Sequence, residues 1–108
     1  MMTNREVFNT YNKAIELYGE KAQKLMAIEE MSELTKEICK DFRGLRDREH
    51  LIEEMADVTI MLDQMLLIYK ISGEEILSMC ARKMKRLKER LEKQNDEIKW
   101  YRKSRNDT

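Results

Sequence analysis

The stretch MADVTIMLDQMLLIY, residues 55–69, contains eleven apolar residues among its fifteen. At about 100° per residue, these side chains point in every direction around a helix. A helix that is apolar all round is buried against other elements. We therefore expect a helix from about Asp47, its N-cap, to Ile71, either at the centre of the fold or packed against a second subunit.

Two helices are predicted before this segment. The first runs from about Asn4 to Tyr18, begins with the capping box Thr3-x-x-Glu6 and stops at Gly19. The second spans about residues 21–42 and has an apolar arc opposite an acidic arc, which is typical of a helix with one packed and one solvated face. The apolar arc contains Ala27, Ile28, Met31, Leu34, Ile38 and Phe42, and the acidic arc contains Glu29, Glu30, Glu33 and Glu37.

A fourth helix is predicted after the segment, beginning with the capping box Ser72-x-x-Glu75. Its apolar residues alternate steps of three and four, as in a coiled coil, and its other faces are basic. This stripe contains Leu77, Cys80, Met84, Leu87 and Leu91. The stripe weakens beyond about Gln94, so we expect one helical domain over residues 1–94 and a basic, partly disordered tail over residues 95–108.

Composition agrees with an all-α protein of one domain. The chain has 108 residues, no proline, three glycines and 39% charged residues, which suits long helices better than a sandwich or barrel. The formal net charge is zero, so bulk charge favours no particular partner, and we expect no nucleic acid. Cys39 and Cys80 lie on apolar helical stripes and are expected to be reduced core thiols.

The sequence shows no sign of a targeting or membrane-spanning segment. The first residues, MMTNREVF, contain no apolar region of a signal peptide. No apolar stretch approaches the roughly 20 residues of a membrane span. The sequence therefore predicts a cytoplasmic protein without a membrane partner.

Two acidic segments carry the candidate chemistry, Glu29-Glu30-Met31-Ser32-Glu33 and Glu53-Glu54-Met55-Ala56-Asp57. Residues three apart share a helix face, so Glu30 projects with Glu33, and Glu54 with Asp57. On antiparallel neighbouring helices, the two pairs would offer four carboxylates to one point. Hard divalent cations such as Mg²⁺ prefer oxygen ligands of this kind.

The two pairs carry unequal weight. Glu30 and Glu33 alone have the pattern of an ordinary solvated helix face. Glu54 and Asp57 share their sector with Met61 and other apolar residues, and a buried carboxylate is costly without a partner. That partner is either a metal ion or a buried Arg or Lys.

The order and spacing Glu29-Glu30-x-x-Glu33 … Glu54-x-x-Asp57 resembles the EExxE…ExxD signature of the MazG-like, all-α NTP pyrophosphohydrolase superfamily. The resemblance runs from about residue 19 to residue 90. It implies a four-helix bundle-like, MazG-type fold, assembled as a homodimer or homotetramer. It also implies Mg²⁺, with Mn²⁺ as a substitute, and the reaction NTP + H₂O → NMP + PPi.

The resemblance also implies roles for individual residues. Glu30, Glu33, Glu54 and Asp57 would hold the metal, and Glu29 would be an outer catalytic carboxylate that positions a ligand or a water. Lys36, Lys83 and Arg86 would bind substrate phosphate. On the fourth helix, the family's usual Asn is replaced by Arg82 and the second Arg of its common Arg-Arg pair by Leu87.

Two alternatives remain open at this stage. The substrate could be phosphoribosyl-ATP, or the chain could be a non-enzymatic helical module whose basic fourth helix binds an acidic partner or nucleic acid. His50, the one histidine, is expected to have a surface or capping role. Trp100 is expected to pack or to make an oligomer contact rather than to stack on a base.

Overall fold

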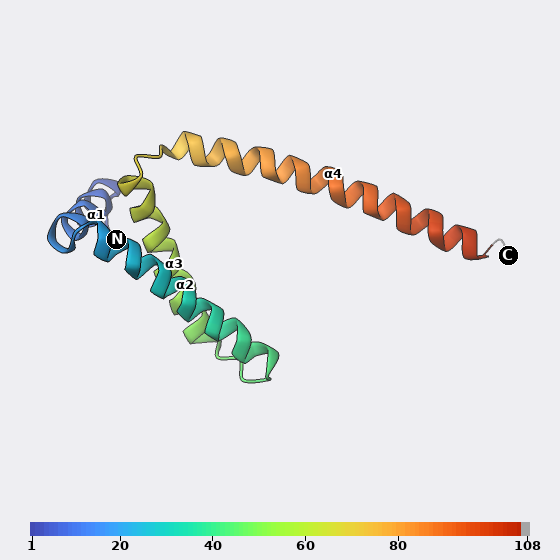
Figure 1. Cartoon of the computed structure of the whole chain (residues 1–108), viewed down its shortest axis with the longest axis horizontal. Coiled ribbons are helices and arrows are strands. Elements are labelled where there is room, and N and C mark those ends of the chain that lie inside the picture. The colour runs from blue at the N-terminus through green and yellow to red at the C-terminus, as the bar shows by residue number, and fades with distance from the viewer. Residues whose placement is uncertain (107–108) are drawn as a thin grey trace. The chain divides into compact units, whose positions relative to one another are not determined.

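The computed structural model describes residues 1–106, and they form four α-helices (Figure 1). The helices are α1 (Asn4–Tyr18), α2 (Glu20–Phe42), α3 (Arg48–Ile68) and α4 (Gly73–Asn106). The prediction of an all-helical protein is confirmed. Helix α4 continues without a break through residues 95–106, which the sequence assigns to a tail, whereas residues 107 and 108 of that tail lie outside the described residues.

The chain divides into two units, Met1–Ile71 with α1, α2 and α3, and Ser72–Thr108 with α4. In the first unit, the three helices pack against one another, and the most extensive packing joins α2 to α3. None of the described helices combines the length and the apolar character that crossing a membrane would require.

Both predicted capping boxes are present. The Thr3 N–H donates to Glu6 Oε2 at 2.9 Å, and the Glu6 N–H donates to Thr3 Oγ1 at 3.1 Å. Ser72 and Glu75 repeat the exchange at 2.7 and 3.1 Å. Each box satisfies N–H groups that the first helical turn leaves without backbone partners.

Helix α3 ends three residues before the predicted Ile71. Its last residue is Ile68, and Lys70 has a positive φ of 56°. The Ile71 N–H then donates to the carbonyl of Leu66 at 2.9 Å, which closes the helix end. The apolar pattern continues beyond the helix because Tyr69 and Ile71 follow it in sequence, but the left-handed residue stops it.

The register of α2 and α3 is antiparallel. Gln23 Nε2 donates to Gln64 Oε1 at 2.7 Å. Seven residues later on α2, Glu30 lies beside Asp57, which is seven residues earlier on α3. Ala27 and Met61 lie between these two pairs and are both buried. This line of contact, which we call the α2–α3 seam, is largely polar.

The packed face of α2 differs from the predicted one. The seam uses Gln23, Ala27, Glu30, Leu34 and Glu37, all buried or half-buried. The predicted apolar arc is therefore only partly packed, and the predicted solvated arc is partly covered. Ile28, Met31, Ile38 and Phe42 are exposed. Glutamates thus occupy positions that a helix pair normally fills with apolar residues.

Helix α3 and the cysteines also depart from expectation. Only Met61 and Gln64 of α3 are buried, whereas Met55 and Leu62 are about half exposed, at 53% and 51%. The apolar character of α3 is therefore not matched by burial inside the chain. Cys39 and Cys80 are free and exposed, so the prediction of core thiols is wrong.

Candidate metal centre

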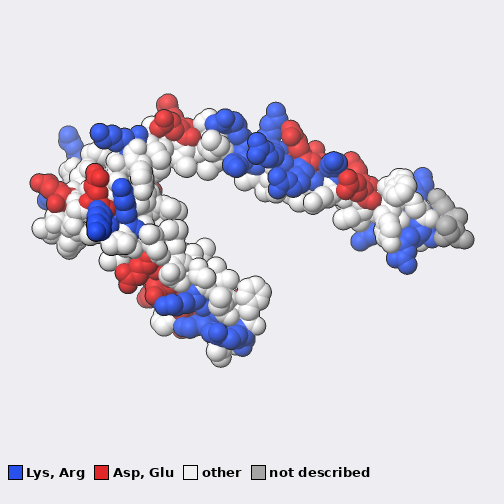
Figure 2. Space-filling model, viewed as in Figure 1, with Lys and Arg blue, Asp and Glu red and all other residues white. Residues whose placement is uncertain are grey.

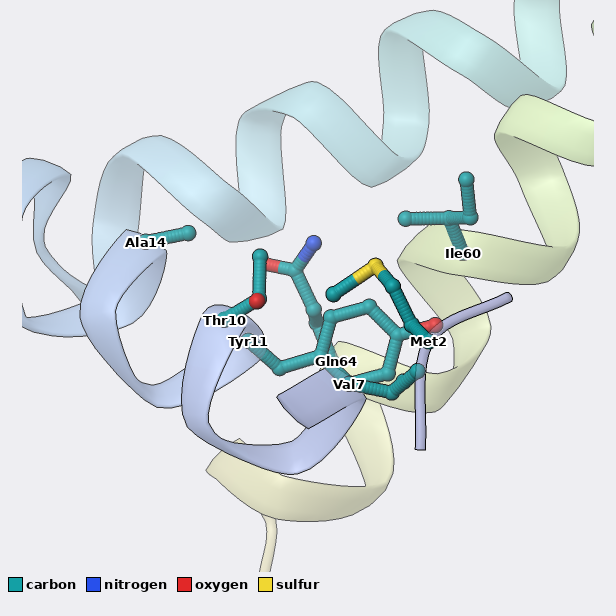
Figure 3. Close-up of a pocket in the computed structure, with 7 residues that line it drawn as sticks. All are labelled: Met2, Val7, Thr10, Tyr11, Ala14, Ile60 and Gln64. Carbon is teal, nitrogen blue, oxygen red and sulfur yellow. The ribbon is translucent and has the colours of Figure 1, made fainter. Parts of the chain in front are cut away.

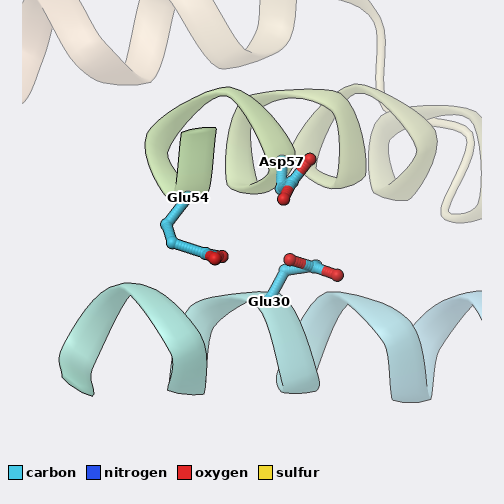
Figure 4. A group of neighbouring side chains, drawn as sticks. All are labelled: Glu30, Glu54 and Asp57. Atoms are coloured by element: carbon cyan, nitrogen blue, oxygen red, sulfur yellow. The ribbon is translucent and has the colours of Figure 1, made fainter. Parts of the chain in front are cut away.

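Three of the predicted metal ligands meet on the α2–α3 seam. One oxygen each from Glu30, Glu54 and Asp57 lie within 4.8 Å of one another. Figure 4 shows Glu30 reaching from α2 towards α3, and Glu54 and Asp57 reaching back. Glu54 and Asp57 project together because they are three residues apart on one helix. The antiparallel register places Glu30 opposite them.

The cluster holds negative charge that no cationic side chain balances. Burial raises the pKa of Glu30, and the charges of Asp57 and Glu54 raise it further. Glu54 Oε2 is buried and has no hydrogen-bond partner. No ion pair between described residues includes Glu30, Glu54 or Asp57. The buried Arg or Lys left open by the sequence is therefore absent from this part of the chain.

The geometry fits a divalent cation. Carboxylate oxygens converging within a few ångströms are the ligands that Mg²⁺ and Mn²⁺ prefer. A cation would balance the like charges and provide a partner for the orphan oxygen of Glu54. Glu30 and Glu54 are half-buried and Asp57 is exposed, so the cluster can be reached from solvent.

Glu33, the fourth predicted ligand, lies outside this cluster. Its Oε1 pairs with Lys36 Nζ at 3.0 Å, and its side chain is 42% exposed. Lys36 is therefore held by a carboxylate, and its predicted phosphate contact stays a prediction. Glu29 is exposed beside Glu30, and its charge makes the smallest contribution to the raised pKa of Glu30.

The remaining predicted residues lie elsewhere. Lys83 and Arg86 are exposed on α4 of the second unit, and their role in phosphate binding stays a prediction. His50 lies on the surface with its side chain 59% exposed, and its Nδ1 is 3.3 Å from Asp47 Oδ2. Trp100 is 70% exposed.

Glu37 is largely covered, although the sequence predicts it on the solvated arc of α2. Its side chain is only 10% exposed, Oε1 accepts from Lys40 Nζ at 3.0 Å, and Oε2 is buried without a partner. The signal was present in the spacing of the seam residues of α2, which alternates steps of four and three. The polar identity of these residues concealed a packing pattern that apolar residues would have made plain.

A pocket of about 310 Å³ lies between α1 and α3 (Figure 3). Its lining is mostly apolar and consists of Met2, Val7, Thr10, Tyr11, Ala14, Ile60 and Gln64. Ile60 and Gln64 follow Asp57 by three and seven residues, which is a rise of roughly 4.5 and 10 Å along α3. The pocket and the carboxylates are therefore neighbours along one helix.

The polar groups of this pocket are already engaged. The Tyr11 hydroxyl donates to Asp63 Oδ2 at 3.1 Å, and burial together with this carboxylate raises the pKa of Tyr11. Thr10 Oγ1 donates to the Glu6 carbonyl at 2.7 Å, and Gln64 Oε1 accepts from Gln23. The pocket thus offers shape and apolar contact more than free hydrogen-bonding groups.

No protein-family model, curated protein or solved structure matches this chain.

Proposed function

We propose that this protein is a Mg²⁺-dependent nucleoside triphosphate pyrophosphohydrolase of the MazG-like type. The observation that carries the proposal is the convergence of Glu30, Glu54 and Asp57 on the seam, with a buried orphan oxygen and no basic partner. An acidic cluster alone is common on protein surfaces. Acids that replace apolar residues between two packed helices need a compensating ligand.

In the proposed reaction, water attacks the α-phosphorus of NTP, the bond from that phosphorus to the bridging oxygen breaks, and pyrophosphate leaves with the bond electrons. A bound Mg²⁺ ion would neutralise phosphate charge and acidify water. Glu30, Glu54 and Asp57 would orient the ion through their converging oxygens. Glu29, exposed beside them, would orient the attacking water.

Glu33 and Lys36 would join the site when substrate binds. Their ion pair is exposed on both sides, at 42% and 67%, so it contributes little to stability and can exchange. A substrate phosphate would attract Lys36 and leave Glu33 available as the fourth ligand that the motif implies. This exchange reconciles the four-carboxylate motif with the three carboxylates that converge.

The apolar pocket would take the nucleoside. It lies within about 10 Å of Asp57 along α3, which matches the extent of a nucleotide whose phosphates lie at the carboxylates. Because Thr10, Tyr11 and Gln64 are already hydrogen-bonded, selection among bases would depend on size and apolar contact.

We also propose that the protein assembles through an outer apolar face, defined by Met31, Ile38, Phe42, Met55 and Leu62. All five are exposed, from 44% for Met31 to 87% for Phe42. On each helix, these residues are rotated around the axis from the seam by roughly a quarter to a third of a turn, in the sense in which the chain winds from its N-terminus. Because α2 and α3 are antiparallel, they fall on one side of the pair, and a patch of this kind usually marks an interface.

The enzymatic proposal is tested by measuring pyrophosphate and NMP release from a panel of ribo-, deoxy- and modified NTPs with Mg²⁺, Mn²⁺ or EDTA. Metal-dependent release from at least one NTP is expected, and phosphoribosyl-ATP in the same panel tests the alternative substrate. Absence of release from every compound would refute the proposal.

The outer apolar face is tested separately by light scattering. Ile38→Glu is expected to lower the mass of the assembly, since it places a charge within the interface. Leu17→Glu is the matched control, because Leu17 is an exposed apolar residue of α1 outside that face. A monomeric wild-type protein at micromolar concentration would contradict assembly.

A further inference from the structure

Helix α4 has 34 residues and buries none of its described residues. A single helix in water is marginally stable, and most helical stability in proteins comes from packing an apolar stripe. Helix α4 has such a stripe and is continuous from Gly73 to Asn106. What covers this stripe therefore decides whether α4 forms.

The stripe is longer than the five residues evident from sequence. Because the helix continues to Asn106, Ile98 and Tyr101 also belong to the stripe. The stripe then runs from Leu77 to Tyr101 in alternating steps of three and four, and Gln94 is its one polar residue. In heptad terms, the first core position holds Leu77, Met84, Leu91 and Ile98, and the second holds Cys80, Leu87, Gln94 and Tyr101. This seam of about 36 Å is an ordinary coiled-coil length.

We infer that α4 pairs with α4 of a second copy of this chain as an antiparallel coiled coil. In the symmetric register, Leu87 packs against the partner's Leu91, and Cys80 packs against the partner's Ile98. Met84 lies against the partner's Gln94, and Leu77 against the partner's Tyr101. Each layer then combines one residue from each core position, as antiparallel seams do.

Charge along α4 favours the antiparallel direction. Figure 2 shows acidic side chains where α4 begins and basic ones crowded along its middle, and the last turn is basic with Lys103 and Arg105. Antiparallel pairing brings the acidic first turn, with Glu74 and Glu75, to the partner's basic last turn. It also aligns the two helix dipoles favourably.

The residues flanking the seam give the same preference. In the antiparallel register, Lys83 meets the partner's Glu97, and Glu74 meets the partner's Arg102. In a parallel pair, Lys83 would face the partner's Lys88. At the centre of the antiparallel pair, Lys88 lies near the partner's Lys88, and Arg90 lies near the partner's Arg90. Glu89 and Glu92 are close to these positive charges on the same helix. Opposite-sign contacts outnumber like-sign ones only in the antiparallel direction.

The first experiment measures the mass of the full-length protein by light scattering for wild type, Leu87→Glu and Met79→Glu. Leu87 and Met79 are both 43% exposed, but Leu87 is in the seam and Met79 is outside it. Leu87→Glu is expected to halve the mass and Met79→Glu to leave it unchanged. An unchanged mass in Leu87→Glu would overturn the inference. This includes an unchanged mass with a lower melting temperature, which is expected if α4 packs on its own chain.

The second experiment determines direction by thiol cross-linking in the Cys39→Ser background, which leaves Cys80 as the one thiol. Antiparallel pairing separates the two Cys80 thiols by about 27 Å along the axis, so a short bismaleimide should not join them. Adding Ile98→Cys should produce a covalent dimer in high yield. Efficient cross-linking through Cys80 alone would overturn the antiparallel direction, and no dimer from either protein would overturn the pairing.

A charge exchange provides a third readout that does not depend on core residues. Glu97→Lys is expected to weaken the assembly at low salt, and adding Lys83→Glu is expected to restore it, since the two positions face each other across the seam. An acidic macromolecule as the natural occupant would instead bind wild type and Leu87→Glu alike, with strong salt dependence. That result would also overturn the inference.

Discussion

The α2–α3 seam and the seam of α4 place polar and apolar residues in opposite ways. Between α2 and α3, the packed positions include Gln23, Glu30 and Glu37, while apolar side chains point outwards. On α4, the seam is apolar apart from Gln94, and none of its residues is buried. A polar seam contributes little hydrophobic free energy. We propose that the α2–α3 seam holds the metal site and that the outer apolar face and α4 serve assembly.

The cost of the polar seam is visible in the core of the first unit. Its buried residues are Ala27, Met61, Gln23 and Gln64, and two of these four are amides. Hydrogen bonding between the two glutamines satisfies groups that burial would otherwise penalise. In the assemblies that we propose, the outer apolar face and α4 would supply the apolar burial that normally stabilises a domain.

The largest expected effect comes from removing a carboxylate from the seam. Glu54→Gln is expected to lower pyrophosphate release by at least about 100-fold, since even residues that only orient metal ligands cost up to that amount. In EDTA, the same variant should melt no earlier than wild type, because it removes like charge from the cluster. Both are measured on one preparation, by product assay and thermal melt.

Glu49→Gln is the control for that prediction, because Glu49 is an exposed acid on the same helix. It should leave activity unchanged. Wild-type activity in Glu54→Gln, or an equal loss in Glu49→Gln, would contradict the prediction that a carboxylate of the seam matters more for activity than one on the surface.

The glutamine pair provides the next largest effect. Gln23→Leu alone leaves the buried Oε1 of Gln64 without its donor and is expected to destabilise the fold by about 1–3 kcal/mol. The double variant with Gln64→Leu should recover most of the loss, because neither side then carries an orphan polar group. Urea denaturation at one protein concentration measures both, and a double variant as unstable as the sum of the singles would contradict this account.

Loss of a cap should have a smaller effect. Ser72→Ala removes the acceptor of the Glu75 N–H at the start of α4 and should cost about 1 kcal/mol. Thr3→Ala removes the equivalent acceptor at the start of α1. If α4 is stabilised by pairing, Ser72→Ala should also raise the protein concentration at which the assembly dissociates. Thr3→Ala should leave that concentration unchanged.

The smallest expected effect is the pH dependence of Glu30. Because the pKa of this carboxyl is raised in the fold, its contribution to stability is present below its ordinary pKa and is lost as the pH rises through the raised value. In EDTA, the metal-free protein should therefore gain less stability between about pH 4 and pH 7 than Glu30→Gln does. Mg²⁺ should reverse the difference, and identical profiles for the two proteins would contradict the raised pKa.

Local features were predictable from sequence to a useful degree. The predictions of both capping boxes and of the stop at Gly19 are confirmed, because these features depend on residues within one turn of each other. The end of α3 was missed because Tyr69 and Ile71 continue the apolar pattern past Lys70, whose left-handed backbone ends the helix. Pattern alone does not report backbone conformation.

The candidate site was predictable in membership but not in geometry. Spacing on each helix correctly paired Glu54 with Asp57, because three residues make nearly one turn. It also paired Glu30 with Glu33, but only Glu30 faces α3, whereas Glu33 lies at the edge of the seam and pairs with Lys36. Which of two acids one turn apart faces a neighbouring helix depends on the rotation of the helix, and no local rule specifies it.

The sequence by itself determined the four helices, their caps and the acids that could bind a cation, since propensity, capping and helical periodicity act between near neighbours. Only the tertiary structure decided that glutamates and glutamines line the α2–α3 seam, that the cysteines are exposed and that the apolar faces of α2 and α3 point outwards. The physical reason is that helix rotation minimises the free energy of the whole packed assembly. A polar stripe becomes an interior when its groups satisfy one another, as Gln23 and Gln64 do, or when a ligand supplies what they lack, as we propose for Glu54.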